Sequence, residues 1–220
     1  MKPIFSTPIL IFLLVIIVGK QTAFAQFSSE FMSARPVGKK QGEITLMYSN
    51  IGASYEGDSE KYFDNLGLLA GIGISPLTEI RFRYDRLTFF GESDNYGLNT
   101  LMAGPKFSTK SGIFAAYLPI GFSFAEDSEN SWQTDPTLLF SFPLGGRTLL
   151  NFTSSYRFGL EELEYIDEGL LALHLGLGIM VAESWIIRPE GGLIFLVGQS
   201  GNYYNFGLGI SRKLGKGPTE

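Results

Sequence analysis

Charged residues occupy every second position in several predicted strands, and these side chains are the ones that could do chemistry. The run IRFRYD at residues 80–85 is the clearest case. Successive side chains of a strand point to opposite faces, so the charges of such a run share one face and the apolar residues share the other. The alternation assigns one common face to Arg81, Arg83, Asp85, Asp135, Arg157, His174, Arg188 and Glu190.

His174 is the only histidine of the sequence and the one side chain that titrates unaided near neutral pH. A catalytic base needs a nucleophile or an acid beside it, and the sequence places neither next to His174. We therefore expect a hydrogen-bonded histidine and no catalytic residue, with a hydrolase that uses His174 as an alternative. The chain has no cysteine, and the acidic segment 161–168 lacks the spacing of a calcium loop. We expect no metal site and no cofactor.

The elements that carry these charges have a large apolar residue at every second position and glycine or a polar residue between. This pattern is clear in LGLLAGIGI at 66–74, LALHLGLGI at 171–179 and FGLGI at 206–210. A strand that is apolar on one face and glycine-lined or polar on the other is typical of a closed barrel in lipid. The alternative is a soluble secreted barrel that binds an apolar ligand, which would turn Leu171, Leu173, Leu175 and Leu177 inward.

Strand and turn signals predict ten strands, an even number that returns the chain to the side on which it began. We expect them near 43–53, 64–75, 79–90, 96–107, 112–124, 132–143, 147–160, 168–181, 185–198 and 203–214. Short connections alternate with longer ones at 56–61, 91–95, 126–131, 161–167 and 199–202, most of them acidic. This asymmetry is typical of periplasmic turns and exterior loops in an up-and-down transmembrane barrel.

Aromatic residues gather at both ends of the predicted strands, where an interfacial girdle belongs. Beside the long loops are Tyr55, Phe63, Phe89, Phe90, Tyr96, Phe124, Trp132, Tyr165, Tyr203 and Tyr204. Beside the short turns are Phe107, Phe142 and Trp185.

The N-terminus has the pattern of a secretory signal: Lys2, an apolar run over 9–18 and the small-x-small sequence AFA before Gln26. We expect residues 1–25 to be cleaved, 26–41 to form a periplasmic lead-in, 42–214 to form the barrel and 215–220 to form a tail. The precursor has a net charge of −5, and loss of Lys2 and Lys20 makes it about −7. A negative chain without a basic stripe argues against nucleic acid as a partner.

In its strand number, outward apolar alternation and loop asymmetry, the sequence over 42–214 resembles the small outer-membrane β-barrel proteins of Gram-negative bacteria. The Ala25-Gln26 junction is similar to those of secreted proteins of Bacteroidetes. The resemblance implies a location in the outer membrane, with lipid and the barrel-insertion machinery as partners. Ten strands are also found in the omptin proteases, but their active-site motifs are missing here, so no catalytic residue is carried over.

These observations predict an all-β, non-enzymatic integral outer-membrane protein. It would be either a structural barrel or a narrow, porin-like passive conduit for small polar solutes. In the first case the inward charges pair across the lumen and plug it. In the second, Arg81, Arg83, Arg157 and Arg188 line a narrow water-filled path.

Overall fold

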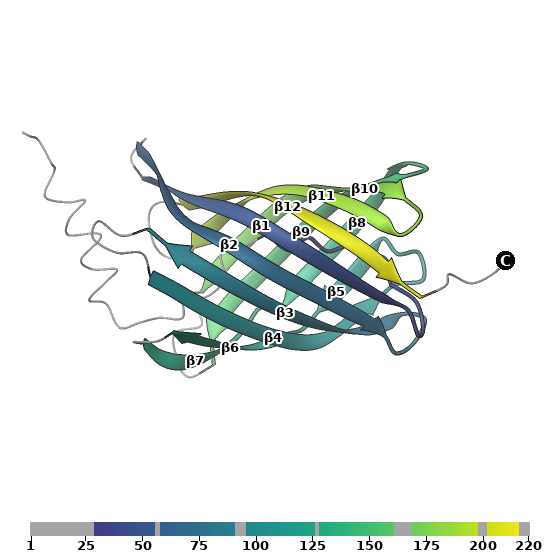
Figure 1. Ribbon diagram of the computed structural model, residues 1–220, viewed down its shortest axis with the longest axis horizontal. Coiled ribbons are helices and arrows are strands. Elements are labelled where there is room, and N and C mark those ends of the chain that lie inside the picture. Colours follow the sequence, from purple (N-terminus) through teal and green to yellow (C-terminus); the bar gives the residue numbers. More distant parts are fainter. Residues whose placement is uncertain are drawn as a thin grey trace, which may run out of the picture.

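A single antiparallel sheet closes on itself to form a barrel (Figure 1). The computed structural model describes residues 29–55, 58–90, 96–125, 128–160, 169–197 and 202–215. The predicted signal peptide and residues 216–220 of the predicted tail lie outside these ranges, as do the predicted loops at 91–95 and 161–167.

Twelve strand segments form the ten strands of the barrel. They are β1 (Gly42–Tyr55), β2 (Asp58–Gly73), β3 (Thr78–Phe89), β4 (Tyr96–Ser108), β5 (Phe114–Tyr117), β6 (Ile120–Ala125), β7 (Ser128–Thr134), β8 (Thr137–Gly145), β9 (Thr148–Gly159), β10 (Leu170–Ala182), β11 (Trp185–Leu196) and β12 (Asn202–Leu214). Segments β5 and β6 form one barrel strand, because both pair with β4, and β7 and β8 form the next, because both pair with β9. Strand β12 pairs with β1 and closes the ring.

The ten predicted strands are confirmed, and their pairing follows chain order around the barrel. Two connections are shorter than we predicted. The hairpin between β1 and β2 leaves only residues 56–57 between its strands, and the one between β6 and β7 leaves only 126–127. The polar segments predicted as loops at 56–61 and 126–131 mostly continue the ladder, because backbone pairing does not require apolar side chains.

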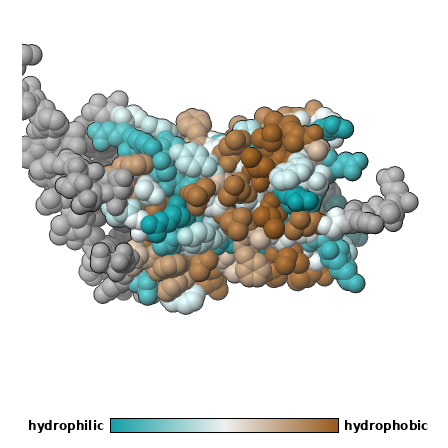
Figure 2. All heavy atoms as spheres, in the orientation of Figure 1, coloured by the Kyte–Doolittle hydropathy of each residue, from teal (hydrophilic) through white to brown (hydrophobic). Residues whose placement is uncertain are grey.

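The apolar face of the strands is the outer face of the barrel. Leu175 is 56% exposed and Phe206 is 68% exposed, whereas the alternate positions His174 and Asn205 are buried. Figure 2 shows apolar side chains gathered over the strands toward the end at which the C-terminus lies. An apolar exterior around a charged interior is the arrangement of a barrel that spans the outer membrane. The alternative of a soluble barrel with inward leucines is therefore wrong. Among the described residues, no helix is long and apolar enough to cross a membrane.

The predicted aromatic girdle is correct only in part. Phe107, Phe142 and Trp185 beside the short turns are exposed on the outside, as are Phe90, Tyr96 and Trp132 near the loops. Phe63, Phe89 and Tyr203 are instead buried inside the barrel. Their positions in the alternation send these three rings inward, and nearness to a loop does not change that direction.

We expect the substitution Leu175→Arg to destabilise the barrel in lipid. Leu175 lies near the middle of β10 and faces outward, and a charged side chain at the bilayer midplane costs about 2–4 kcal/mol. Denaturant titration of the protein folded into vesicles measures this loss. The matched control is Glu183→Arg in the exposed turn after β10, which should leave the unfolding free energy almost unchanged. Equal stability of the two variants would contradict the orientation of the strands.

Candidate functional site: the filled lumen

All eight charged residues assigned to one face by alternation lie inside the barrel. Each of them is at most 7% exposed. They come from β3, β9, β10 and β11, and from Asp135 in the short interval between β7 and β8. The strands alone therefore direct these side chains into one lumen, where each charge requires a partner.

A first ion-pair network lies in the half of the lumen nearest the short turns, which we call the turn end. Glu43 accepts from Arg81 at 3.2 Å and from Arg188 at 3.0 Å. Glu79 is 2.8 Å from Arg81 and 2.6 Å from the Lys106 ammonium. The network joins β1, β3, β4 and β11 across the lumen, and its cations outnumber its carboxylates by three to two.

A second network lies closer to the middle of the barrel. Arg83 contacts Asp85 at 2.7 Å and Glu30 at 2.9 Å, and Arg157 forms an ion pair with Asp135. The carboxamide of Asn65 donates a further hydrogen bond to Asp85 at 2.7 Å. Here the carboxylates outnumber the cations, so the charges of the two networks are opposite in sign and nearly balance.

Glu30 belongs to a segment outside the barrel wall. Residues 29–35, which we call the lumen segment, run from the middle of the lumen to the turn end. At one end Asn205 of β12 donates to the Ser29 hydroxyl at 3.0 Å, and at the other Lys106 of β4 donates to the Arg35 carbonyl at 3.0 Å. Residues 26–41 were expected as a periplasmic lead-in, and the sequence did not predict that part of this stretch enters the barrel.

Side chains of the barrel wall accept hydrogen bonds from the backbone N–H groups of the lumen segment. The Glu190 carboxylate accepts the N–H groups of Glu30 at 2.6 Å and Phe31 at 3.1 Å. The Ser141 hydroxyl accepts the N–H of Ala34 at 2.8 Å. An irregular backbone at membrane depth is tolerated only where such partners replace water, so Glu190 and Ser141 make the insertion possible.

Apolar side chains of the lumen segment fill the remaining space at the turn end. Phe31, Met32 and Ala34 pack with inward residues of the wall, namely Met47, Leu69, Ala115, Tyr117 and Leu139. Glycines of the wall make room for them. A Cβ at Gly207 would lie 2.6 Å from the Phe31 ring, and one at Gly209 would lie 3.1 Å from it. At these two positions the inward glycines accommodate the segment.

The end of the lumen nearest the long loops, which we call the loop end, has two unlike halves. On the side of β10, β11, β12, β1, β2 and β3 it is filled by an apolar cluster: Ile51, Phe63, Leu87, Phe89, Leu170, Ala172, Ile194 and Tyr203. On the opposite side the buried inward residues are polar, with Thr100 and Ser123 hydrogen-bonded to each other at 3.1 Å and Gln133 beside them. A polar solute could contact the wall only along this polar half.

His174 lies in mid-lumen and is 2% exposed. Its Nε2 is 3.1 Å from the Asn205 carboxamide, which also holds Ser29. Among the described residues its Nδ1 has no hydrogen-bond partner. The geometry therefore joins His174 to the lumen segment through Asn205.

Four charged lumen residues were missed by the sequence reasoning. Glu43, Glu79 and Lys106 share the inward parity of their strands, so the same alternation could have identified them. Glu30 precedes the first strand, and no pattern in the sequence places it near Arg83. Taken together, side chains of the wall and of the lumen segment place two ion-pair networks and two apolar clusters inside the part of the barrel that the structure describes.

No family model matches this chain, and no curated protein matches it. Solved outer-membrane barrels do. The translocator domain of the autotransporter NalP from Neisseria meningitidis has a TM-score of 0.47 and 11% identity, covering 80% of this chain and 89% of that one. The attachment invasion locus protein Ail of Yersinia pestis has a TM-score of 0.40 and 12% identity, covering 80% and 99%. Likenesses this low carry no conclusion about what the chain does.

We expect Arg83→Met to cost about 3–5 kcal/mol of unfolding free energy, because it leaves two buried carboxylates, Glu30 and Asp85, without their guanidinium partner. The control is Lys61→Met, which removes the exposed pair with Asp64 and should cost about 0–1 kcal/mol. Both values come from denaturant titrations in the same vesicles. If the two losses were equal, the central network would not hold the barrel together.

Proposed function

We propose that this chain is a non-enzymatic outer-membrane barrel that acts as a narrow passive conduit for small polar solutes, closed at rest by its own lumen segment. The observation that carries the proposal is the division of the interior into a wall and a separate insert. The wall presents Arg83, Glu190, Ser141 and Lys106, and these side chains hold the charged and backbone groups of the insert.

The contacts that hold the lumen segment to the wall would allow the segment to leave the lumen. The lumen segment contributes no strand to the sheet, so its displacement breaks no ladder hydrogen bond of the wall. Once it leaves, Arg81, Arg83 and Arg188 face the vacated space, as do inward glycines such as Gly207 and Gly209. A solute would then pass the polar half of the loop end and reach a charged channel at the turn end.

The second candidate is a structural barrel in which the lumen segment is permanent. The observation that favours it is the completeness of the two ion-pair networks, since removing one member of a buried pair is costly. We propose no catalytic role for His174, because its ring faces the amide of Asn205 deep in the lumen.

A disulfide lock between the segment and the wall tests the conduit. The chain has no native cysteine, and the side chains of Ser29 and Asn205 are hydrogen-bonded at 3.0 Å, so Ser29→Cys with Asn205→Cys places two thiols within reach. In a planar bilayer we expect the unsubstituted protein to show intermittent openings. The oxidised double variant should be silent, and reduction should restore its openings.

The matched control is Thr45→Cys with Ser211→Cys. These hydroxyls are 2.8 Å apart on neighbouring strands, so their disulfide staples the wall and leaves the lumen segment alone. Openings that persist in the oxidised Ser29/Asn205 variant would show that the segment is not the gate. A correctly inserted protein that is silent in every state would support the structural barrel instead.

A further inference from the structure

The ladder between the barrel strand made of β5 and β6 and the one made of β7 and β8 is interrupted near its middle. Tyr117 pairs with Thr137, and three residues later Ile120 pairs with Thr134. In this interval lie Leu118-Pro119 on one barrel strand and Asp135-Pro136 on the other, and no ladder pair joins them. Proline has no backbone N–H to donate. The carbonyl of Pro119 faces the break and accepts from the Thr134 hydroxyl at 2.6 Å, so the N–H that Pro119 lacks is missing from the ladder at this place. The Pro136 carbonyl accepts from the Tyr156 N–H on the side of β9.

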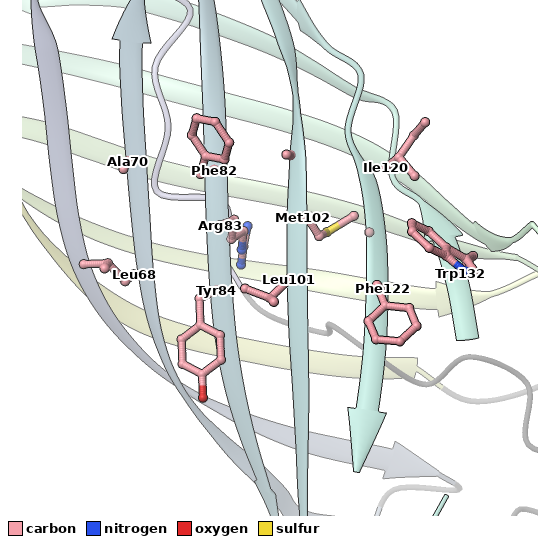
Figure 3. A pocket seen from close by; sticks show the side chains of 12 residues that line it. Leu68, Ala70, Phe82, Arg83, Tyr84, Leu101, Met102, Ile120, Phe122 and Trp132 are labelled. Carbon is pink, nitrogen blue, oxygen red and sulfur yellow. The ribbon is translucent and has the colours of Figure 1, made fainter. Parts of the chain in front are cut away.

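The lipid-facing surface is hollowed over and beside this break. A hollow of about 280 Å³ lies directly on it, lined by Leu118, Pro136, Leu138 and Tyr156 among others. A larger one, of about 420 Å³, is lined by residues of β2, β3, β4, β6 and β7, and these include Ile120 next to the break. Figure 3 shows its lining, with Phe82 and Tyr84 of β3 on one side, Phe122 and Trp132 on the other, and Leu101 and Met102 between them. Both hollows lie on the outer face and are lined mainly by apolar side chains.

On the lumen side of the break lies a cluster of buried polar atoms that lack partners. In the part of the chain that the structure describes, no hydrogen bond is made by the Tyr117 hydroxyl, either polar atom of the Gln133 carboxamide, Asp135 Oδ1 or Glu30 Oε1. Tyr117 and Asp135 border the break, Gln133 precedes Asp135 on the same face, and Glu30 lies close enough to interact electrostatically with Tyr117 and Asp135. Each of these four residues is at most 2% exposed.

Unpaired buried polar atoms are costly, and a group of them marks a place for a ligand or water. Three of the five atoms are acceptor oxygens of carboxyl or carboxamide groups, and two of those belong to acidic side chains. Glu30 and Asp135 are paired with Arg83 and Arg157, but with Asp85 their network has three carboxylates to two guanidinium groups. The ligand that complements the unpaired atoms therefore carries hydrogen-bond donors and a positive charge. An apolar body attached to such a head would fit the hollows outside.

We propose that the break at Pro119 and Pro136 is a lateral portal, through which a single-chain amphipathic amine from the bilayer places its ammonium head among Tyr117, Gln133, Asp135 and Glu30 while its apolar body stays in the outer hollows. This route is distinct from the axial path closed by the lumen segment. It needs no displacement of that segment, because the head group meets the wall from the side.

A single cysteine reports access to the site. In phosphatidylcholine vesicles, Gln133→Cys should react with N-ethylmaleimide, which dissolves in the bilayer, and should resist a charged sulfonate thiol reagent confined to water. The control is Thr100→Cys, which is also buried in the lumen but lies behind unbroken ladders and two ladder positions nearer the loop end. Entry by the loop mouth would label Thr100→Cys at least as fast as Gln133→Cys. Entry by the portal should label Gln133→Cys at least about tenfold faster, which equals a barrier difference of about 1.4 kcal/mol.

Closing the break gives a second, independent readout. Pro119→Val restores a backbone N–H that faces the break, on the same side as the carbonyl of residue 119, and should slow the labelling of Gln133→Cys about tenfold. Should this variant fold poorly, the comparison between Gln133→Cys and Thr100→Cys still decides the question. Equal labelling of the two cysteines, or labelling of Gln133→Cys by the sulfonate reagent, would overturn the portal.

Added amphiphiles test the head group. Dodecylamine should protect Gln133→Cys from N-ethylmaleimide, and dodecanoate, with the same chain length and an anionic head, should not. Equal protection by both would overturn the assignment of an amine, and protection by neither would overturn the binding site.

Discussion

The structure depends on one constraint: charge placed inside a barrel must be neutralised there, because the surrounding bilayer offers no water. The eight predicted charges enter the lumen because strand alternation sends them there, and their burial then dictates most of what is found inside. Glu43 and Glu79 pair with the cations at the turn end. Nearer the middle, Asp85 and Glu30 pair with Arg83, and Asp135 pairs with Arg157. The lumen segment is part of this solution, since it brings a carboxylate to Arg83 and two backbone donors to Glu190.

Features that depend on a two-residue period could be predicted from the sequence. The strands, their order and the inward direction of residues such as Arg81 and Asp135 follow from alternation alone, which is a local property of the chain. Where two local signals disagreed, the alternation prevailed. Phe63 lies near a loop, as a girdle residue would, but it shares the parity of the inward Asn65 and is buried.

The contents of the lumen could not be predicted in the same way. The hydrogen bonds from Glu30 and Phe31 to Glu190 join residues 160 and 159 positions apart, and no repeat or motif in the sequence relates them. The ladder break was missed for a different reason. Pro119 and Pro136 are visible in the sequence, but only the register shows that they lie on facing strands at the same height.

The position of Phe31 against Gly207 has a consequence for the order in which the barrel assembles. Gly207 lies on β12, whose pairing with β1 joins residues as distant in sequence as Gly42 and Leu214. Contacts between such distant residues carry the largest loop-closure cost, so we expect this seam to be the slowest part of the ring to form. Because the Phe31 ring packs on the inner side of that seam, the lumen segment offers β12 an apolar surface to dock on. The first residues of the described chain thus help the last strand find its place.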